Sequence, residues 1–156
     1  MDKNVRILIV DDDEIIRKTM QIILEDEGYV VDLATTGNEA IEMTQETAYN
    51  IALLDIRLPD MEGVELLKLM KDNVPRTRKI MVTGYPSMQN AISALNKNAD
   101  AYLIKPVDIE KLLKLIKAQL QLQKEETKCS EQKVAEFIET RVKEITMQNS
   151  DNDLKV

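Results

Sequence analysis

Short apolar runs alternate with longer amphipathic stretches along most of the chain. The runs occupy residues 5–10, 30–33, 51–54, 80–82 and 101–104, and their β-branched residues and leucines are typical of buried strands. Between them, apolar residues recur three and four positions apart, which predicts helices marked by residues 15–24, 40–43, 66–70, 88–95 and 109–120. This alternation predicts a doubly wound α/β domain, with a parallel sheet covered on both faces by helices. Ligands of such domains bind at the carboxyl ends of the strands, so we expect the chemistry there.

The pattern changes near residue 122, where we expect the domain, residues 1–122, to end. Residues 123–133 are polar, and apolar spacing then returns at Val134, Phe137, Ile138, Val142 and Ile145. Three interpretations of the extension, residues 123–156, stay open: a helix that pairs as a coiled coil, the start of a linker in a longer protein, or a partly ordered tail. We expect the extension to be too short for an independent DNA-binding or catalytic domain.

Polar groups with complementary chemistry stand at the ends of four predicted strands. They are Asp11, Asp12 and Asp13 after the first strand, Asp55 after the third, Thr83 after the fourth and Lys105 after the fifth. Carboxylates that converge from two strands repel one another, and Mg²⁺ relieves this repulsion because it prefers carboxylate, water and phosphate oxygens. An aspartate can also act as a nucleophile that forms an acyl phosphate, while a cation and a hydroxyl stabilise the phosphoryl oxygens. Asp55 stands alone after an apolar strand and is therefore the candidate nucleophile.

Each of these residues also has an ordinary structural interpretation. An aspartate after a strand is commonly a helix N-cap, and Asp13 before Glu14 fits that role well. A lysine before a proline, such as Lys105 before Pro106, is commonly just part of a turn. The functional interpretation depends on the occurrence of all the groups together, in an order that brings them to one edge of the sheet.

Composition and charge exclude several classes of function. The 156 residues carry a net charge of −7, which disfavours direct binding to nucleic acid or to anionic membrane surfaces. The chain has no histidine and one cysteine, Cys129, so imidazole catalysis and His- or multi-Cys zinc sites are excluded, and a reducing compartment is favoured. We see no signal-peptide pattern and no run of about 18 apolar residues, and we therefore expect a cytoplasmic location.

The sequence resembles the receiver domain of two-component response regulators over roughly residues 4–122. The stretches that carry the resemblance are ILIVDDDEIIR, NIALLDIRLPDMEGVELLK and KIMVTGYPSMQNAISALNKNADAYLIKP. The resemblance implies the CheY-like, flavodoxin-like fold with strand order 2-1-3-4-5. It also implies that Asp55 takes a phosphoryl group from the phosphohistidine of a sensor histidine kinase. In this family's pattern, Asp12 binds Mg²⁺ directly, Asp11 binds it mainly through water, and the main-chain carbonyl of Arg57 completes the protein ligands.

The same resemblance assigns the parts of a switch. Lys105 would pair with one phosphoryl oxygen, and Thr83 would donate a hydrogen bond to another. As Thr83 is drawn to the phosphate, the ring of Tyr102 would move inward. The Lys105–Pro106 peptide is typically cis in this family, so we expect a cis-proline at Pro106.

The resemblance also points to partners. The output surface would comprise the fourth helix, fifth strand and fifth helix, residues 87–98, 101–104 and 109–122, and would bind a downstream protein or a second copy in a homodimer.

The bulky Arg57 and Tyr85 stand two positions after Asp55 and Thr83, where we expect them to slow the loss of the phosphoryl group to water.

Other functions compete with the phosphoacceptor, which catalyses only its own phosphorylation and dephosphorylation. One is an unphosphorylated protein-interaction scaffold, and another is a receiver fragment of a longer regulator. A third is a phosphatase of the haloacid-dehalogenase type, but that class carries a second aspartate two residues after the nucleophile, where this chain has Arg57.

Overall fold

The computed structural model describes residues 4–70, 73–84 and 99–153. The chain separates into two compact units, Met1–Gln123 and Lys124–Val156. The elements in chain order are β1 (Arg6–Val10), α1 (Glu14–Asp26), β2 (Val30–Ala34), α2 (Gly37–Glu46), β3 (Ile51–Asp55), α3 (Gly63–Leu69), β4 (Arg78–Thr83), β5 (Ala101–Ile104) and α5 (Ile109–Asp153). The helix predicted at residues 88–95, the part of the expected output surface at residues 87–98, and Tyr85 lie outside the described residues.

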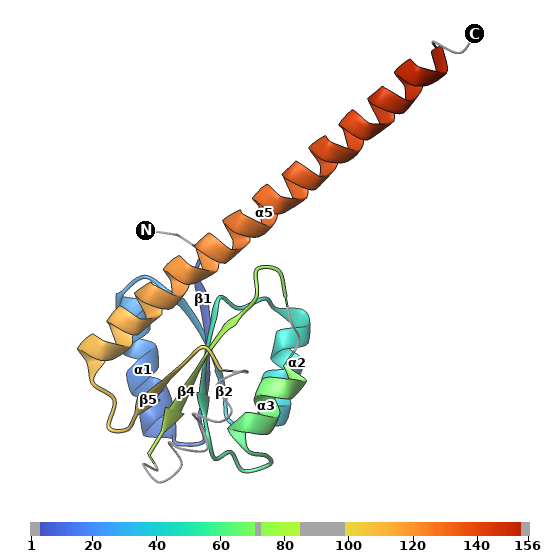
Figure 1. Cartoon of the computed structure of the whole chain (residues 1–156). Helices are drawn as coiled ribbons and strands as arrows, with labels where there is room; N and C mark the ends of the chain where they lie inside the picture. Colours follow the sequence, from blue (N-terminus) through green and yellow to red (C-terminus); the bar gives the residue numbers. More distant parts are fainter. Residues whose placement is uncertain (1–3, 71–72, 85–98, 154–156) are drawn as a thin grey trace. The chain divides into compact units, whose positions relative to one another are not determined.

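The first unit is built on one five-stranded sheet in the order β2-β1-β3-β4-β5 (Figure 1). All four pairs of neighbouring strands are parallel. The predicted fold and strand order are therefore confirmed. β3 is the central strand and is buried along its whole length, as its uninterrupted apolar sequence predicts.

The alternation of side chains along the strands divides the core into two layers. Ile7 and Ile9 of β1 belong to one hydrophobic cluster. That cluster also contains Met20 and Leu24 of α1 and Leu112 and Ile116 of α5. Leu8 and Val10 point to the opposite face, where the cluster includes Ala40 of α2 and Leu66 and Leu67 of α3. Figure 1 shows α1 and the start of α5 on one side of the sheet and α2 and α3 on the other. The sheet is thus covered on both faces, and the ends of its strands are left as the place where functional side chains can gather.

The part of α5 that belongs to the first unit ends at Gln123, which makes polar contacts within that unit. The side-chain amide of Gln123 donates to the main-chain oxygens of Asn50 at 3.1 Å and Arg76 at 2.8 Å. The side-chain amide of Asn50 donates in turn to the Gln123 oxygen at 3.0 Å. Asn50 and Arg76 precede β3 and β4, so Gln123 lies at the end of the sheet opposite the strand carboxyl ends.

The second unit consists, in the part that the structure describes, of the C-terminal portion of α5. The helix continues through residues 123–133 without interruption, so the apolar repeat that follows lies on the same helix. Val134, Ile138, Val142 and Ile145 are all more than half exposed within it. Among the described residues, no helix is apolar over a length that would cross a membrane.

Asp100 connects the start of β5 to the start of β4 through several donors. The Arg76 guanidinium donates to both carboxylate oxygens, at 2.8 and 3.1 Å, and the main-chain amide of Lys79 donates at 2.8 Å. Burial alone would raise the pKa of Asp100, but the hydrogen bonds from Arg76 and Lys79 and the charges of Arg76 and Arg78 outweigh it and hold the pKa below its usual value.

A lowered pKa in the folded state makes the stabilisation by Asp100 depend on pH. The stabilisation is complete above the pKa of an unfolded aspartate, about 3.9, and is lost as the pH falls through the lower pKa of the folded state. We expect Asp100→Asn to reduce the free energy of unfolding by about 1–3 kcal/mol at pH 7 and by less as the pH falls below about 4. Urea unfolding at several pH values would measure this, with the exposed Asp26→Asn as the control; an equal loss at every pH would contradict it.

Candidate phosphoacceptor and metal site

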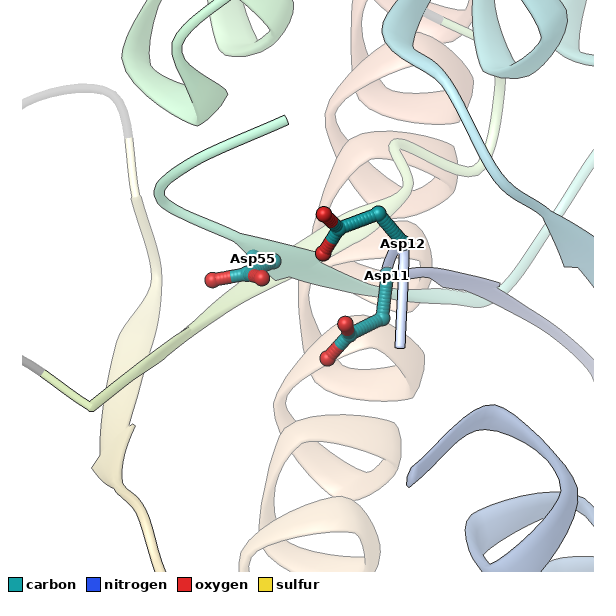
Figure 2. Close-up of side chains that lie close together, drawn as sticks. All are labelled: Asp11, Asp12 and Asp55. Carbon is teal, nitrogen blue, oxygen red and sulfur yellow. The ribbon is translucent and has the colours of Figure 1, made fainter. Parts of the chain in front are cut away.

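Three carboxylates meet at the carboxyl edge of the sheet because β1 and β3 are neighbours. Asp11 directly follows β1, and Asp55 is the last residue of β3. Asp11, Asp12 and Asp55 each offer an oxygen within 4.8 Å of the others, and Figure 2 shows their carboxylates around a common space. Asp11 is 2% exposed and Asp55 7%, whereas Asp12 is open to solvent. The site therefore combines two buried carboxylates with one that solvent can reach.

Lys105 bridges the two buried carboxylates from the end of β5. Its Nζ lies 2.9 Å from Asp11 Oδ2 and 3.4 Å from Asp55 Oδ2. The main-chain amide of Lys105 donates to the Thr83 carbonyl at 2.6 Å, which links the ends of β4 and β5. The Lys105–Pro106 peptide is cis. The geometry thus gathers Asp11, Asp12, Asp55 and Lys105, which come from three strand ends.

The environment raises the pKa of both Asp55 and Lys105. Burial and the nearby negative charge of Asp11 raise the pKa of Asp55, and Lys105 only partly offsets this effect. Burial would lower the pKa of Lys105, but its contacts with Asp11 and Asp55 outweigh burial and raise it. Lys105 therefore stays charged, and the cluster retains an excess of negative charge that favours a cation.

The end of β1 is fixed by its own hydrogen bonds. Asp11 Oδ1 accepts from the main-chain amide of Asp13 at 2.9 Å, and the Asp11 carbonyl accepts from the Arg17 guanidinium at 2.6 Å. Asp13 caps α1 by accepting from the amides of Ile15 and Ile16, which confirms the N-cap predicted from the sequence. Arg17 was not among the predicted site residues. In the sequence, this role of Arg17 is indicated only by its position, as a positively charged residue one turn after the N-cap of α1.

The loop after Asp55 is a narrow turn that brings Gly63 back beside the phosphoacceptor candidate. Arg57 and Glu62 form an antiparallel bridge, and the Gly63 amide donates to the Ile56 carbonyl at 2.6 Å. The Arg57 amide also donates to Asp55 Oδ1 at 3.4 Å. A Cβ built on Gly63 would overlap the carbonyl oxygen of Asp55, so this close approach requires glycine.

Thr83 and Tyr102, the expected switch residues, occupy different environments. Thr83 is the last residue of β4, lies beside β3 and β5 in the sheet, and is fully buried. Tyr102 lies in the edge strand β5 and is 42% exposed. Thr83 is therefore at the same edge of the sheet as Asp55, and the Tyr102 ring lies at the surface.

The donor set suits a hard divalent cation. Asp11, Asp12 and Asp55 offer only oxygen as ligand atoms, and the burial of Asp11 and Asp55 limits the number of waters that can solvate their charges. Mg²⁺ favours a small number of carboxylates and keeps some of its waters, which the exposed side of Asp12 would allow. The residues present therefore fit Mg²⁺.

Comparison with known proteins connects this geometry to a family. The response regulator receiver domain family matches residues 7–117. Regulatory protein AtoC of Escherichia coli K12 is 35% identical over 118 residues, which cover 76% of this chain and 26% of AtoC. The transcriptional regulatory protein YkoG of Bacillus subtilis is 37% identical, and the match covers 73% of this chain and 50% of YkoG. The chain thus spans between about a quarter and a half of these relatives.

Solved structures agree with this relationship. A CheY-like receiver domain protein from Methanospirillum hungatei JF-1 is 49% identical with a TM-score of 0.71, over 78% of this chain and 98% of that one. Response regulator TrrA from Thermotoga maritima, solved in complex with Mg²⁺-BeF, is 29% identical with a TM-score of 0.66, over 74% of this chain and 98% of that one. On the family match, the shared fold and the acidic strand edge, this chain belongs to the response regulator receiver domain family.

Proposed function

We propose that this protein accepts a phosphoryl group on Asp55 from a sensor histidine kinase and changes conformation to control the binding of a partner protein. The observation that carries the proposal is the convergence of Asp11, Asp12 and Asp55 at one edge of the sheet, with Lys105 2.9 Å from Asp11 and 3.4 Å from Asp55. Receiver domains are phosphoacceptors, and Asp55 ends the central strand where this family's nucleophile would be expected.

In the proposed reaction, an Asp55 carboxylate oxygen attacks the phosphorus of the kinase's phosphohistidine. The new O–P bond forms as the P–N bond breaks, and the imidazole leaves with the electron pair and takes up a proton. Asp11, Asp12, Asp55 and the main-chain carbonyl of Arg57 would hold Mg²⁺. The bound ion would supply neutralisation of the charge on the phosphoryl oxygens. The similar protein TrrA was solved in complex with Mg²⁺-BeF, which supports the proposal that this chain also binds Mg²⁺.

Two residues are proposed to act on the phosphoryl group after transfer. Lys105 pairs with one phosphoryl oxygen, and it starts from a position already in contact with Asp55. The Thr83 hydroxyl donates to another, and its movement draws the exposed Tyr102 ring inward. The added charge and acceptor oxygens then bias an equilibrium between two conformations.

The proposed partners follow from the surface next to the switch. We propose that β5 and the adjoining part of α5 bind a downstream protein, with a homodimer as the alternative; residues 87–98, which complete the expected output surface, lie outside the described residues. The chain's net charge of −7 supports the proposal that it contacts neither nucleic acid nor an anionic membrane surface directly. The proposed location is the cytoplasm. Since the relatives AtoC and YkoG are longer regulators, a receiver portion of a longer protein is an alternative arrangement.

Labelling with a small phosphodonor tests the proposed function. Incubation with Mg²⁺ and acetyl phosphate is expected to add the mass of one phosphoryl group, and Asp55→Asn is expected to abolish the increase while Asp26→Asn leaves it unchanged. Intact-protein mass spectrometry with and without EDTA would measure it. Rapid release of inorganic phosphate without accumulation of the labelled protein would support a phosphatase instead, and no labelling would support a scaffold.

A further inference from the structure

We propose that Asp60 is a positioning residue, which fixes the loop after Asp55 for Mg²⁺ binding by anchoring the tip of that loop to the start of α2. The inference rests on the proposed function, because it takes Asp55 and the Arg57 carbonyl as metal ligands. Asp60 itself lies at the surface and belongs to no part of the carboxylate cluster.

The anchor consists of two hydrogen bonds from the amides at the start of α2. Asp60 Oδ1 accepts from the Gly37 amide, and Asp60 Oδ2 accepts from the Asn38 amide, both at 2.9 Å. The side chain of the local N-cap, Thr36, accepts a hydrogen bond from the Glu39 amide, and within the described ranges from no other amide at this helix start. The first amides of a helix have no acceptor within the helix. The Asp60 carboxylate supplies an acceptor for the Gly37 and Asn38 amides, which Thr36 does not bind. These hydrogen bonds from Asn38 and Gly37 also lower the pKa of Asp60, so it is charged at neutral pH.

The residue after Asp60 adds an apolar contact to the same helix start. A Cβ built on Gly37 would overlap the sulfur of Met61, so the Met61 side chain lies directly on the glycine. Met61 also packs against the core cluster that contains Ala40 of α2. The tip of the loop is therefore held by polar and apolar contacts at once.

The shape of the loop carries this restraint to its base. The Leu58 amide donates to the Met61 carbonyl at 3.1 Å, and Arg57 and Glu62 form a bridge one step nearer to the sheet. The Gly63 amide then donates to the Ile56 carbonyl at 2.6 Å. Asp60 is at the closed end of this ladder, Arg57 is in its middle step, and Asp55 directly precedes its open end at Ile56. Groups that orient metal ligands from outside the coordination sphere typically change metal affinity when they are removed.

Three variants separate positioning from a general effect of charge. Asp60→Ala removes both acceptors, Asp60→Asn keeps one amide oxygen that can accept from the helix, and Glu42→Ala removes an exposed carboxylate elsewhere in α2. Titration calorimetry with MgCl₂ would give the dissociation constant for Mg²⁺. Labelling rates with acetyl phosphate over a range of Mg²⁺ would give the half-saturating concentration and the plateau separately.

We expect Asp60→Ala to weaken Mg²⁺ binding about tenfold, to raise the half-saturating concentration by the same factor, and to leave the plateau rate near that of the wild type. Asp60→Asn should lie between Asp60→Ala and the wild type, and Glu42→Ala should match the wild type. The inference is overturned if Asp60→Ala binds Mg²⁺ as the wild type does, or if Asp60→Asn and Glu42→Ala weaken binding as much as Asp60→Ala. If Asp60→Ala does not fold by circular dichroism, Asp60→Asn decides, and wild-type affinity in that variant overturns the inference. Wild-type protein that binds Mg²⁺ without becoming labelled would refute the proposed function, while the calorimetry would still decide the role of Asp60.

Discussion

Lys105→Ala is expected to slow the phosphorylation of Asp55 by acetyl phosphate about 100-fold, the usual loss when a fixed donor to a charged transition state is removed. Lys105 Nζ lies within contact distance of both buried carboxylates, so it is already placed at the edge where the phosphoryl oxygens would arrive. Its raised pKa keeps it charged through neutral pH, and the effect should therefore persist over that range. Labelling rates at saturating Mg²⁺, measured by intact-protein mass spectrometry, would test this prediction.

Two variants serve as controls for Lys105→Ala. Lys114→Ala removes an exposed lysine from α5 and should label at the wild-type rate. Lys105→Arg keeps the charge but replaces a compact ammonium by a planar group, and it should recover part of the rate. A wild-type rate in Lys105→Ala would show that the lysine serves only to neutralise Asp11 and Asp55.

Gly63→Ala is expected to reduce the free energy of unfolding by about 1–3 kcal/mol through overpacking. The added methyl group would overlap the main-chain oxygen of Asp55 and would come within 2.9 Å of the Met81 methyl group. A flexible side chain could move aside, but the Asp55 carbonyl belongs to the central strand and cannot move without disturbing the sheet. Since the same carbonyl belongs to the phosphoacceptor candidate, the labelling rate should fall as well.

Gly84→Ala is the matched control for Gly63→Ala. Among the described residues, a Cβ on Gly84 would meet the Lys105 side chain alone, at the ordinary distances of 3.7 and 3.8 Å. Urea unfolding should therefore show a large loss for Gly63→Ala and a small change for Gly84→Ala. Equal stability of the two variants would mean that the loop moves away from Asp55 at little cost.

The sheet was predictable from local sequence wherever its strands are apolar. The central strand is an example, because residues 51–54 are apolar and the observed β3 differs from the prediction only by including Asp55. β4 begins earlier than predicted, at Arg78, because Arg78 and Lys79 are polar yet belong to the strand. The Lys79 side chain is only 6% exposed, and the Lys79 amide is bonded to Asp100. The partner is 21 residues away, so no local pattern could show this contact.

In the site, too, local contacts were predictable from the sequence and contacts between distant residues were not. The N-cap role of Asp13 depends on residues two and three positions ahead, and the sequence predicted it correctly. The role of Asp60 was not predicted, because its hydrogen-bond partners Gly37 and Asn38 lie more than 20 residues earlier in the chain. Which strand ends meet was predictable because parallel strands share a carboxyl edge. The groups that hold those ends in place lie far apart in the sequence, so they could be identified only from the structure.

The site of phosphorylation can be measured directly by chemical trapping. After incubation with Mg²⁺ and acetyl phosphate, borohydride reduction converts an aspartyl phosphate to homoserine, and tandem mass spectrometry of the digested protein locates the change. The proposed function predicts homoserine at position 55 and nowhere else, and no conversion without Mg²⁺. Conversion at Asp11 or Asp12, or an unmodified residue 55 in protein that carries the phosphoryl mass, would contradict the assignment of Asp55 as the phosphoacceptor.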